Sequence, residues 1–218
     1  MNITPELLLN AYMQGIFPMT EGPDSNDVFW VDPEERGIFP LDDFHVPKSL
    51  AKKIKRNEFD VRINTAFREV MRHCATPTDN EDRKSTWIND MILTKYAELH
   101  DMGYAHSIEC WQGDELVGGL YGVSLNGAFC GESMFHWVTD VSKVALVYLV
   151  ARLKVGGYSL LDTQFVTDHL SQFGAIEIPR KEYRVRLKEA LENETSDFYS
   201  LPDDADGSTI LQSVTQTS

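Results

Sequence analysis

Three polar side chains interrupt the most apolar part of the sequence. Glu132 lies within one apolar run, and Asp162 and Gln164 end the next, two positions apart. Alternate residues of a strand project from the same face, so a strand ending at residue 164 would place Asp162 and Gln164 side by side. Burial of such groups costs several kcal/mol unless they are paired. We therefore expect them to belong either to a structural network, such as a polar strand end that caps the next helix, or to a reaction centre.

The surrounding pattern predicts the strands and helices that hold these side chains. Asn126-Gly127 is a strong hairpin signal between two apolar runs. The predicted strands cover 106–111, 116–123, 128–134, 159–162 and 175–178, and the predicted helices run from residue 140 to the Gly156-Gly157 pair, over 165–173 and over 181–191. Antiparallel strands followed by a crossover to a further strand are typical of the acyl-CoA N-acyltransferase (GNAT-like) fold, of the α+β class.

The first hundred residues predict a smaller, mostly helical domain. Thr4-Pro5-Glu6 begins a helix, because a capping hydroxyl, a proline in the first turn and an acid suit its amino end. Further helices are expected over 45–56, from 65 to 74 and from a Thr86 cap to near Gly103, with strands over 38–40 and 59–64. We predict an N-terminal domain at residues 1–100, a GNAT-like domain at 101–192 and a polar, partly disordered tail at 193–218.

Composition places the chain among globular proteins. Its 218 residues are 42% apolar and 25% charged. No apolar run approaches the roughly 20 residues that span a bilayer, and the amino terminus lacks the features of a signal peptide. Cys74, Cys110 and Cys130 form no Cys-x-x-Cys pattern. We therefore expect no disulfide framework, no metal site, no membrane contact and a cytoplasmic location.

A basic cluster contrasts with the formal net charge of −14, which by itself argues against a polyanionic partner. The cluster falls within nine residues and consists of Lys48, Lys52, Lys53, Lys55 and Arg56. Two interpretations stay open, a solvated helix face or a surface that contacts a phosphate backbone.

An ordered set of short motifs resembles leucyl/phenylalanyl-tRNA–protein transferases over roughly residues 5–190. The motifs are Ala-Tyr-Met-Gln-Gly-Ile-Phe-Pro at 11–18, Trp-Val-Asp-Pro at 30–33, Thr-Trp-Ile at 86–88, His-Ser-Ile-Glu at 106–109, Gly-Gly-Leu-Tyr-Gly-Val at 118–123, Gly-Glu-Ser-Met-Phe at 131–135, Ser-Lys at 142–143 and Asp-Thr-Gln at 162–164. The resemblance implies an enzyme that transfers Leu or Phe from aminoacyl-tRNA to an N-terminal Arg or Lys of proteins, which marks them for N-end-rule degradation. It implies no cofactor, since aminoacyl-tRNA is a co-substrate, and we expect a monomer.

The same resemblance assigns roles to the three polar residues. Asp162 and Gln164 match the catalytic pair, in which the Gln164 carbonyl accepts a hydrogen bond from the attacking amine while Asp162 orients and polarises the amide. Glu132 matches a residue near the ester, where its charge can anchor the α-amino group of the substrate. Because the aminoacyl ester is already activated, proximity supplies much of the rate. The route of the proton stays open between Gln164, water and the leaving ribose hydroxyl.

The resemblance also implies binding surfaces. Met134, Phe129 and Phe135 are candidates for the aminoacyl pocket, with Met134 preferred because only alternate strand residues face one way. Trp30 is expected to stack on the 3′ adenine, and Trp87 to line the same cleft. The basic cluster, Lys48, Lys52, Lys53, Lys55 and Arg56, is expected to contact acceptor-stem phosphates.

Departures and alternatives narrow the interpretation. The Gly-rich turn that holds CoA in GNAT acetyltransferases is missing from residues 137–142, which disfavours a CoA donor. His136 and Trp137 are unusual for the family, and we expect them to narrow the pocket or alter selectivity. Transferases that build peptidoglycan cross-bridges are an alternative, but they usually carry two GNAT-like domains, and a chain of 218 residues is too short for two. A non-catalytic binder of tRNA or of N-degrons is the third class considered.

Overall fold

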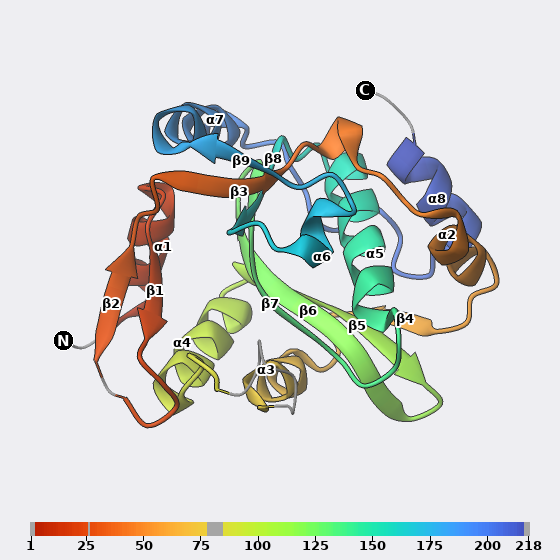
Figure 1. Ribbon diagram of the computed structural model, residues 1–218, viewed down its shortest axis with the longest axis horizontal. Coiled ribbons are helices and arrows are strands. Elements are labelled where there is room, and N and C mark those ends of the chain that lie inside the picture. Colours follow the sequence, from red (N-terminus) through yellow and green to blue (C-terminus); the bar gives the residue numbers. More distant parts are fainter. Residues whose placement is uncertain (1–2, 26, 78–84, 216–218) are drawn as a thin grey trace.

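A mixed seven-stranded sheet forms the centre of the computed structural model, which describes residues 3–25, 27–77 and 85–215 (Figure 1). The strand order is β4-β5-β6-β7-β8-β3-β9. The strands are β3 (Glu35–Phe39), β4 (Asp60–Ile63), β5 (Ala105–Gln112), β6 (Glu115–Leu125), β7 (Ala128–His136), β8 (Leu160–Gln164) and β9 (Ile176–Pro179), and a separate hairpin consists of β1 (Phe17–Thr20) and β2 (Val28–Val31).

Helices cover both faces of the sheet. They are α1 (Pro5–Met13), the 3₁₀ turn η1 (Leu41–Asp43), α2 (Lys48–Lys55), α3 (Phe67–Ala75), α4 (Asp90–Asp101), α5 (Val141–Val155), α6 (Asp168–Ser171), α7 (Arg180–Glu192) and α8 (Gly207–Thr215). One core cluster joins α5, α2 and α8 to one face, and a second joins α1, α3 and α4 to the other. The α+β class is therefore confirmed.

The antiparallel strands and the crossover predicted from the sequence are present. β5, β6 and β7 form an antiparallel meander, and Asn126 takes the left-handed conformation (φ 49°) that the tight turn before β7 requires. From β7 the chain crosses through α5 to β8, which pairs with β7 in parallel. α5 is buried nearly all round, in keeping with its apolar sequence. This crossover brings the end of β8 beside the middle of β7.

Strands from both sides of residue 100 share this sheet. β3 lies between β8 and β9, and β4 pairs with β5 at the sheet edge, so two strands from the first hundred residues pair with strands from the later part. The hairpin of β1 and β2 was not predicted, because its strands are short and lack clear alternation of polar and apolar residues. The domain boundary at residue 100 stays a prediction, although the sheet itself crosses it.

Part of the tail that we predicted to be disordered is folded. Residues 207–215 form α8, which packs on α5 and α2 and buries Ile210 and Val214. The buried guanidinium of Arg152 holds the preceding segment by donating to the carbonyl oxygens of Phe198 (2.8 Å) and Leu201 (2.9 Å). Composition suggested disorder because few apolar residues occur here, but those few join the core cluster that α2 and α5 also form.

The start of α4 also differs from the prediction. Asn89, rather than Thr86, caps the helix, since its side chain accepts a hydrogen bond from the N–H of Ile92 (2.8 Å). Over the described ranges, no helix is long and apolar enough to cross a membrane. Cys74, Cys110 and Cys130 are all buried.

Candidate active site

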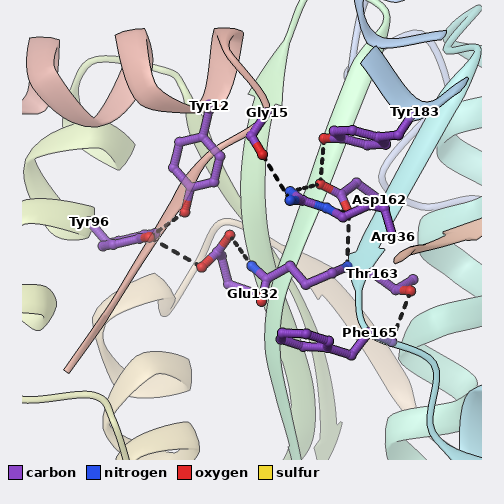
Figure 2. A network of polar contacts seen from close by, with 10 residues as sticks. Tyr12, Gly15, Arg36, Tyr96, Glu132, Asp162, Thr163, Phe165 and Tyr183 are labelled. Atoms are coloured by element: carbon purple, nitrogen blue, oxygen red, sulfur yellow. Dashed lines mark hydrogen bonds and ion pairs between the residues drawn. The ribbon is translucent and has the colours of Figure 1, made fainter. Parts of the chain in front are cut away.

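Asp162 sits near the end of β8 and is completely buried. Its carboxylate accepts two hydrogen bonds from Arg36, Nε to Oδ1 at 2.9 Å and Nη2 to Oδ2 at 2.6 Å, in a bidentate ion pair. The hydroxyl of Tyr183 on α7 donates to Oδ2 at 2.8 Å. Figure 2 shows this carboxylate between the two donors. Both oxygens are therefore engaged, which holds the carboxylate in one place.

Gln164 adopts a backbone conformation that is rare for residues other than glycine, with φ 64°. Its backbone N–H donates to Oδ1 of Asp162 at 2.8 Å, which stabilises this turn of the chain. The register with β3 shifts here, and Gly37 faces Gln164. A Cβ at Gly37 would lie 2.6 Å from the backbone carbonyl carbon of Phe165, so only glycine allows this close approach. Positive φ in a side-chain-bearing residue is typical of functional sites.

The side chain of Gln164 contacts Glu132 and not Asp162. Its Nε2 donates to Oε1 of Glu132 at 3.0 Å. The hydrogen bond between Asp162 and Gln164 is instead made by the Gln164 backbone N–H. The expectation that Asp162 polarises the Gln164 amide stays a prediction. The turn at φ 64° carries the side chain away from Asp162 and toward β7.

Glu132 owes its position to a bulge in β7. Tyr121 pairs with Ser133 and Gly122 pairs with Gly131, which leaves Glu132 as an extra residue. A bulge of this kind redirects a side chain, and bulges are common beside active sites. Glu132 thereby faces Tyr96, whose hydroxyl donates to Oε2 at 3.1 Å.

A short polar chain extends from Glu132 to α1. The hydroxyls of Tyr96 and Tyr12 are hydrogen-bonded to each other (Figure 2). Burial raises the pKa of both phenols well above the ordinary value of 10.0, so both remain protonated at neutral pH. Burial also raises the pKa of Glu132 to about 7, although the hydroxyls of Tyr12 and Tyr96 favour its charged form. Glu132 is thus the carboxyl group in this network that titrates near neutrality.

An apolar cavity of about 230 Å³ adjoins Glu132. Met134 lines it, together with Leu120 of β6 and Leu146 of α5. The complete lining is Phe39, Leu120, Tyr121, Gly131, Glu132, Ser133, Met134, Leu146, Leu149, Leu161, Thr163, Thr167, His169 and Leu170. The cavity therefore offers an apolar interior with a carboxyl group at its wall.

The other residues expected in the pocket do not line this cavity. Phe129 is buried against Phe198, their rings stacked at 5.8 Å between centroids. Phe135 lies in the core cluster on the other side of the sheet, stacked on His73 at 4.7 Å. Phe135 follows Met134 directly on the strand and therefore points to the opposite face of the sheet. Their assignment to the pocket is not supported by their placement.

His136 and Trp137 also lie outside the cavity lining. His136 is exposed at the end of β7, and the exposed Trp137 donates its indole N–H to Nδ1 of His73 at 3.1 Å. If His136 and Trp137 affect the selectivity of this cavity, they do so without contacting the molecule bound in it.

The two tryptophans assigned to the adenosine lie near each other in the fold but apart from the cavity lining. Trp30 is on β2 opposite Pro18, and Trp87 precedes α4; both are partly buried against the cluster around α1 and α4. Thr20 of β1 donates its hydroxyl to the carbonyl oxygen of Trp87 at 2.6 Å, which ties the hairpin to the start of α4.

The basic cluster occupies α2 and its end. Lys48, Lys52, Lys55 and Arg56 are exposed, whereas Lys53 is half-buried and pairs with Asp140 at 2.8 Å. Asp140 also binds Lys143 at 2.9 Å, and hydrogen bonds from the two lysines lower the pKa of this carboxyl. Among the described residues, no group of three or more His, Cys, Asp and Glu side chains is placed to hold a metal ion.

Sequence reasoning missed the residues that support the site. Arg36, Tyr183, Tyr12 and Tyr96 all contact Asp162 or belong to the chain that ends at Glu132. Tyr12 lies in one of the family motifs, which was the available signal for it. Arg36 follows two glutamates and offered no signal, because its partner is 126 positions away.

Comparison with known proteins gives a consistent result over nearly the whole chain. The model of the leucyl/phenylalanyl-tRNA protein transferase family matches residues 38–188, and the model of that family's N-terminal domain matches residues 1–34. The chain is 56% identical to a relative from Maricaulis maris (strain MCS10) over 213 residues, which cover 98% of this chain and 97% of the relative. It is 53% identical to one from Phenylobacterium zucineum (strain HLK1) over 216 residues, 97% and 96% of the two chains. A relative from Paramagnetospirillum magneticum (strain ATCC 700264 / AMB-1) is 57% identical over 189 residues, 87% and 90%. All three relatives bear the name leucyl/phenylalanyl-tRNA–protein transferase.

Proposed function

The chain belongs to the leucyl/phenylalanyl-tRNA protein transferase family, and we propose that it transfers Leu or Phe from aminoacyl-tRNA to the N-terminal Arg or Lys of acceptor proteins. This reaction would mark the acceptor for the N-end-rule pathway. The observation that carries the proposal is the identity of 53–57% to relatives of that name along nearly the whole chain.

The reaction needs positioning more than covalent catalysis. The acceptor α-amine attacks the carbonyl carbon of the aminoacyl ester, a C–N bond forms, and the bond to the ribose oxygen breaks. The tRNA leaves with a free hydroxyl, and the proton released by the amine balances the proton that this hydroxyl gains. Because an ester is already activated, alignment of the amine with the carbonyl supplies a large part of the rate.

Glu132 is the proposed proton acceptor and anchor for the amino groups in this reaction. Asp162 is unsuited to that role, since Arg36, Tyr183 and the Gln164 backbone engage both its oxygens. The pKa of Glu132 is about 7, and its side chain borders the cavity. A base with a pKa near the working pH combines a populated charged form with useful proton affinity.

Gln164 is proposed to hold the attacking amine. Its Nε2 donates to Glu132, which directs the amide carbonyl oxygen away from that carboxyl group. The carbonyl oxygen is an acceptor and suits the N–H of an incoming amine. Asp162 then contributes by holding the turn on which Gln164 sits, through the backbone N–H at 2.8 Å.

The cavity is the proposed site for the side chain of the transferred residue. Its volume of about 230 Å³ and its Leu and Met lining suit an apolar side chain that is unbranched at Cβ, such as Leu or Phe. Met134 adapts to either shape because it is unbranched and flexible. Because Glu132 lies at the wall of the cavity, its carboxylate would be close to the charged amino group of the transferred Leu or Phe.

The tRNA contacts are proposed at two other surfaces. Trp30 and Trp87 offer stacking for the 3′ adenosine, and the exposed face of α2 offers cations to acceptor-stem phosphates. Such backbone contacts carry no sequence information, which suits a protein that accepts more than one tRNA.

Because aminoacyl-tRNA is its donor, we further propose that the protein acts in the cytoplasm. We also propose that it acts as a monomer.

The catalytic part is proposed to have a GNAT-like architecture. In support, the meander β5-β6-β7 leads through α5 to β8, parallel to β7. The candidate site lies where the pairing of β7 with β8 ends, although aminoacyl-tRNA here takes the place of a CoA thioester.

A transfer assay tests the function. The purified protein is incubated with Leu-tRNA or Phe-tRNA and a peptide that begins with Arg, in parallel with the same peptide beginning with Ala. We expect the Arg peptide alone to gain the mass of one Leu or Phe residue. No gain from either donor, with tRNA binding retained, would contradict the proposal and favour a non-catalytic tRNA binder.

A further inference from the structure

Arg36 is a buried cation at the junction between the two parts of the chain. It lies on β3 between the stretches 1–34 and 38–188 that the two family models match. Its side chain is only 1% exposed, and Arg36 is the largest of the fully buried side chains. Burial alone disfavours a guanidinium charge, yet the carboxylate of Asp162 outweighs this effect and raises the pKa of Arg36. The charge is therefore retained inside the protein.

The contacts of Arg36 connect the candidate site to the end of α1. Two of its nitrogens bind Asp162, and Nη1 donates to the carbonyl oxygen of Gly15 at 2.9 Å (Figure 2). The guanidinium also lies over the rings of Phe17 and Tyr183, at 4.6 and 4.4 Å from their centroids. These contacts hold the planar group on its edge and on its faces.

The same segment of α1 reaches the other half of the site. Tyr12, three residues before Gly15, is hydrogen-bonded to Tyr96, which donates to Glu132. One turn of chain therefore touches Glu132 through the two tyrosines and Asp162 through Arg36. Gly15 is at φ 79°, a conformation that side chains rarely adopt, and a Cβ there would lie 3.0 Å from the Tyr183 ring.

We propose that Arg36 is a positioning residue for the transfer reaction. Arg36 bridges the carboxylate of Asp162 and the carbonyl oxygen of Gly15, and so fixes the position of Asp162. Because Asp162 accepts the hydrogen bond from the Gln164 N–H, this holds the turn at Gln164 and aligns the Gln164 side chain with Glu132. The inference rests on the proposed function, because alignment has a measurable consequence only if the site catalyses transfer.

The geometry distinguishes this role from that of a simple core contact. A buried ion pair is often replaceable by apolar residues without loss of stability, so stability gives little reason for this one. The fork of Arg36 binds both oxygens of Asp162, and Oδ1 is also the acceptor for the Gln164 N–H. A shift of the carboxylate would therefore move the backbone that carries Gln164. Lysine cannot reproduce the fork, since its ammonium is a single point charge.

Arg152 provides a matched control. It is also buried, at 2% exposed, and it also binds two backbone carbonyl oxygens and a carboxylate, that of Asp203 at 2.8 Å. Its partners lie in the segment before α8 and not in the candidate site. A substitution there disturbs a buried arginine network without touching Asp162.

The test compares Arg36→Lys, Arg36→Met and Arg152→Lys with the unchanged protein. For each, kcat and KM for Leu-tRNA and for an Arg-initiated peptide are measured, together with thermal unfolding. We expect kcat of Arg36→Met to fall on the order of 100-fold, the loss that a displacement of about 1 Å causes. The kcat of Arg36→Lys should fall less than that of Arg36→Met. In both variants, KM for Leu-tRNA should change little. Arg152→Lys should lower the unfolding temperature and leave kcat near that of the unchanged protein.

The outcomes separate the two proposals. If the unchanged protein transfers Leu but Arg36→Lys keeps its full kcat, the positioning role is overturned. It is equally overturned if Arg152→Lys loses as much kcat as Arg36→Lys at an equal loss of stability. If the unchanged protein itself transfers nothing, the proposed function fails. Should Arg36→Met not fold, Arg36→Lys still decides, because it retains the buried positive charge.

Discussion

Two carboxyl groups of the candidate site lie in opposite environments. Asp162 has a guanidinium, a phenol and a backbone N–H as donors. Glu132 faces two phenols, an amide and an apolar cavity, and burial raises its pKa to about 7. Here Asp162 would supply fixed structure, and Glu132 would exchange a proton.

At the residue scale, the pKa of Glu132 predicts a pH dependence. Transfer should increase as the pH rises through about 7, because the carboxylate and not the acid accepts a proton. Glu132→Gln should lower kcat by about 10²–10⁴-fold, the usual contribution of a general base. The measurement is kcat across neutral pH with saturating peptide. Uncatalysed ester hydrolysis at each pH is subtracted.

Stability gives an independent check on the same residue. A folded-state pKa of about 7 against an ordinary value of 4.5 means that the folded protein binds the proton more tightly. Glu132 therefore costs stability as the pH rises from about 4.5 to 7, and the cost is fully present above 7. Glu132→Gln should remove this slope. An unchanged pH profile of unfolding in the variant would contradict the raised pKa.

At the scale of elements, irregular strands place the functional groups. A bulge in β7 turns Glu132 toward Tyr96, and the register shift between β3 and β8 accompanies the turn at Gln164. Both irregularities lie where the parallel pair of β7 and β8 ends. In a regular sheet, successive side chains alternate between the two faces. The bulge in β7 and the register shift beside β8 instead bring the side chains of Glu132 and Gln164 together.

A buried glutamate shows that another family motif serves the fold. Glu109 on β5 is fully buried beside the start of α3, where it accepts hydrogen bonds from the hydroxyls of Thr65 and Ser107 and from the N–H of Ala66 (2.8 Å). Negative charge at the amino end of a helix is favourable. The motif at 106–109 thus anchors α3 to the sheet.

We predict that Glu109→Gln lowers the free energy of unfolding by about 1–3 kcal/mol, since one buried donor loses its acceptor. Urea unfolding measures the change. Glu115→Gln, at the exposed start of β6, is the control and should change the value by no more than about 0.5 kcal/mol. Equal effects of the two substitutions would argue against an anchoring role for Glu109.

At the scale of the whole molecule, charge is unevenly distributed. The chain carries a formal net charge of −14, yet four residues of α2 and its end are exposed cations, namely Lys48, Lys52, Lys55 and Arg56. α2 lies beside α8 at one edge of the molecule (Figure 1). Lys53 differs from the other members because Asp140 holds it. The acidic remainder would repel tRNA elsewhere and so favour one orientation on this surface.

Charge reversal tests this surface. Lys52→Glu together with Lys55→Glu should weaken tRNA binding and reduce the slope of log K against log salt by about 0.7–0.9 for each phosphate that is no longer neutralised. Lys181→Glu with Lys188→Glu, on exposed positions of α7, changes the net charge equally at a distant helix. Binding is measured by titration at several salt concentrations. If both pairs weaken it equally, only net charge matters and the basic cluster has no specific role.

Local patterns were sufficient to predict most of the fold. The meander, the crossover helix and β8 follow from alternation, from the Asn126-Gly127 turn and from the apolar run of α5, all of which act within a few residues. Predictions failed where local signals were weak. The hairpin of β1 and β2 lacks alternation, and α8 depends on packing against α2 and α5, which lie far away in the sequence.

The order of motifs alone was enough to indicate the family and the class of reaction, because these follow from residue type and spacing. The roles of Glu132, Asp162 and Gln164 stay predictions. How the three residues contact one another required the folded chain. Arg36 meets Asp162 across 126 positions, and Gln164 meets Glu132 across 32. No local propensity encodes such pairs, since burial and strand register create them together. In the folded chain, Asp162 binds the Gln164 backbone, the Gln164 side chain binds Glu132, and Arg36 links Asp162 to the Gly15 carbonyl oxygen.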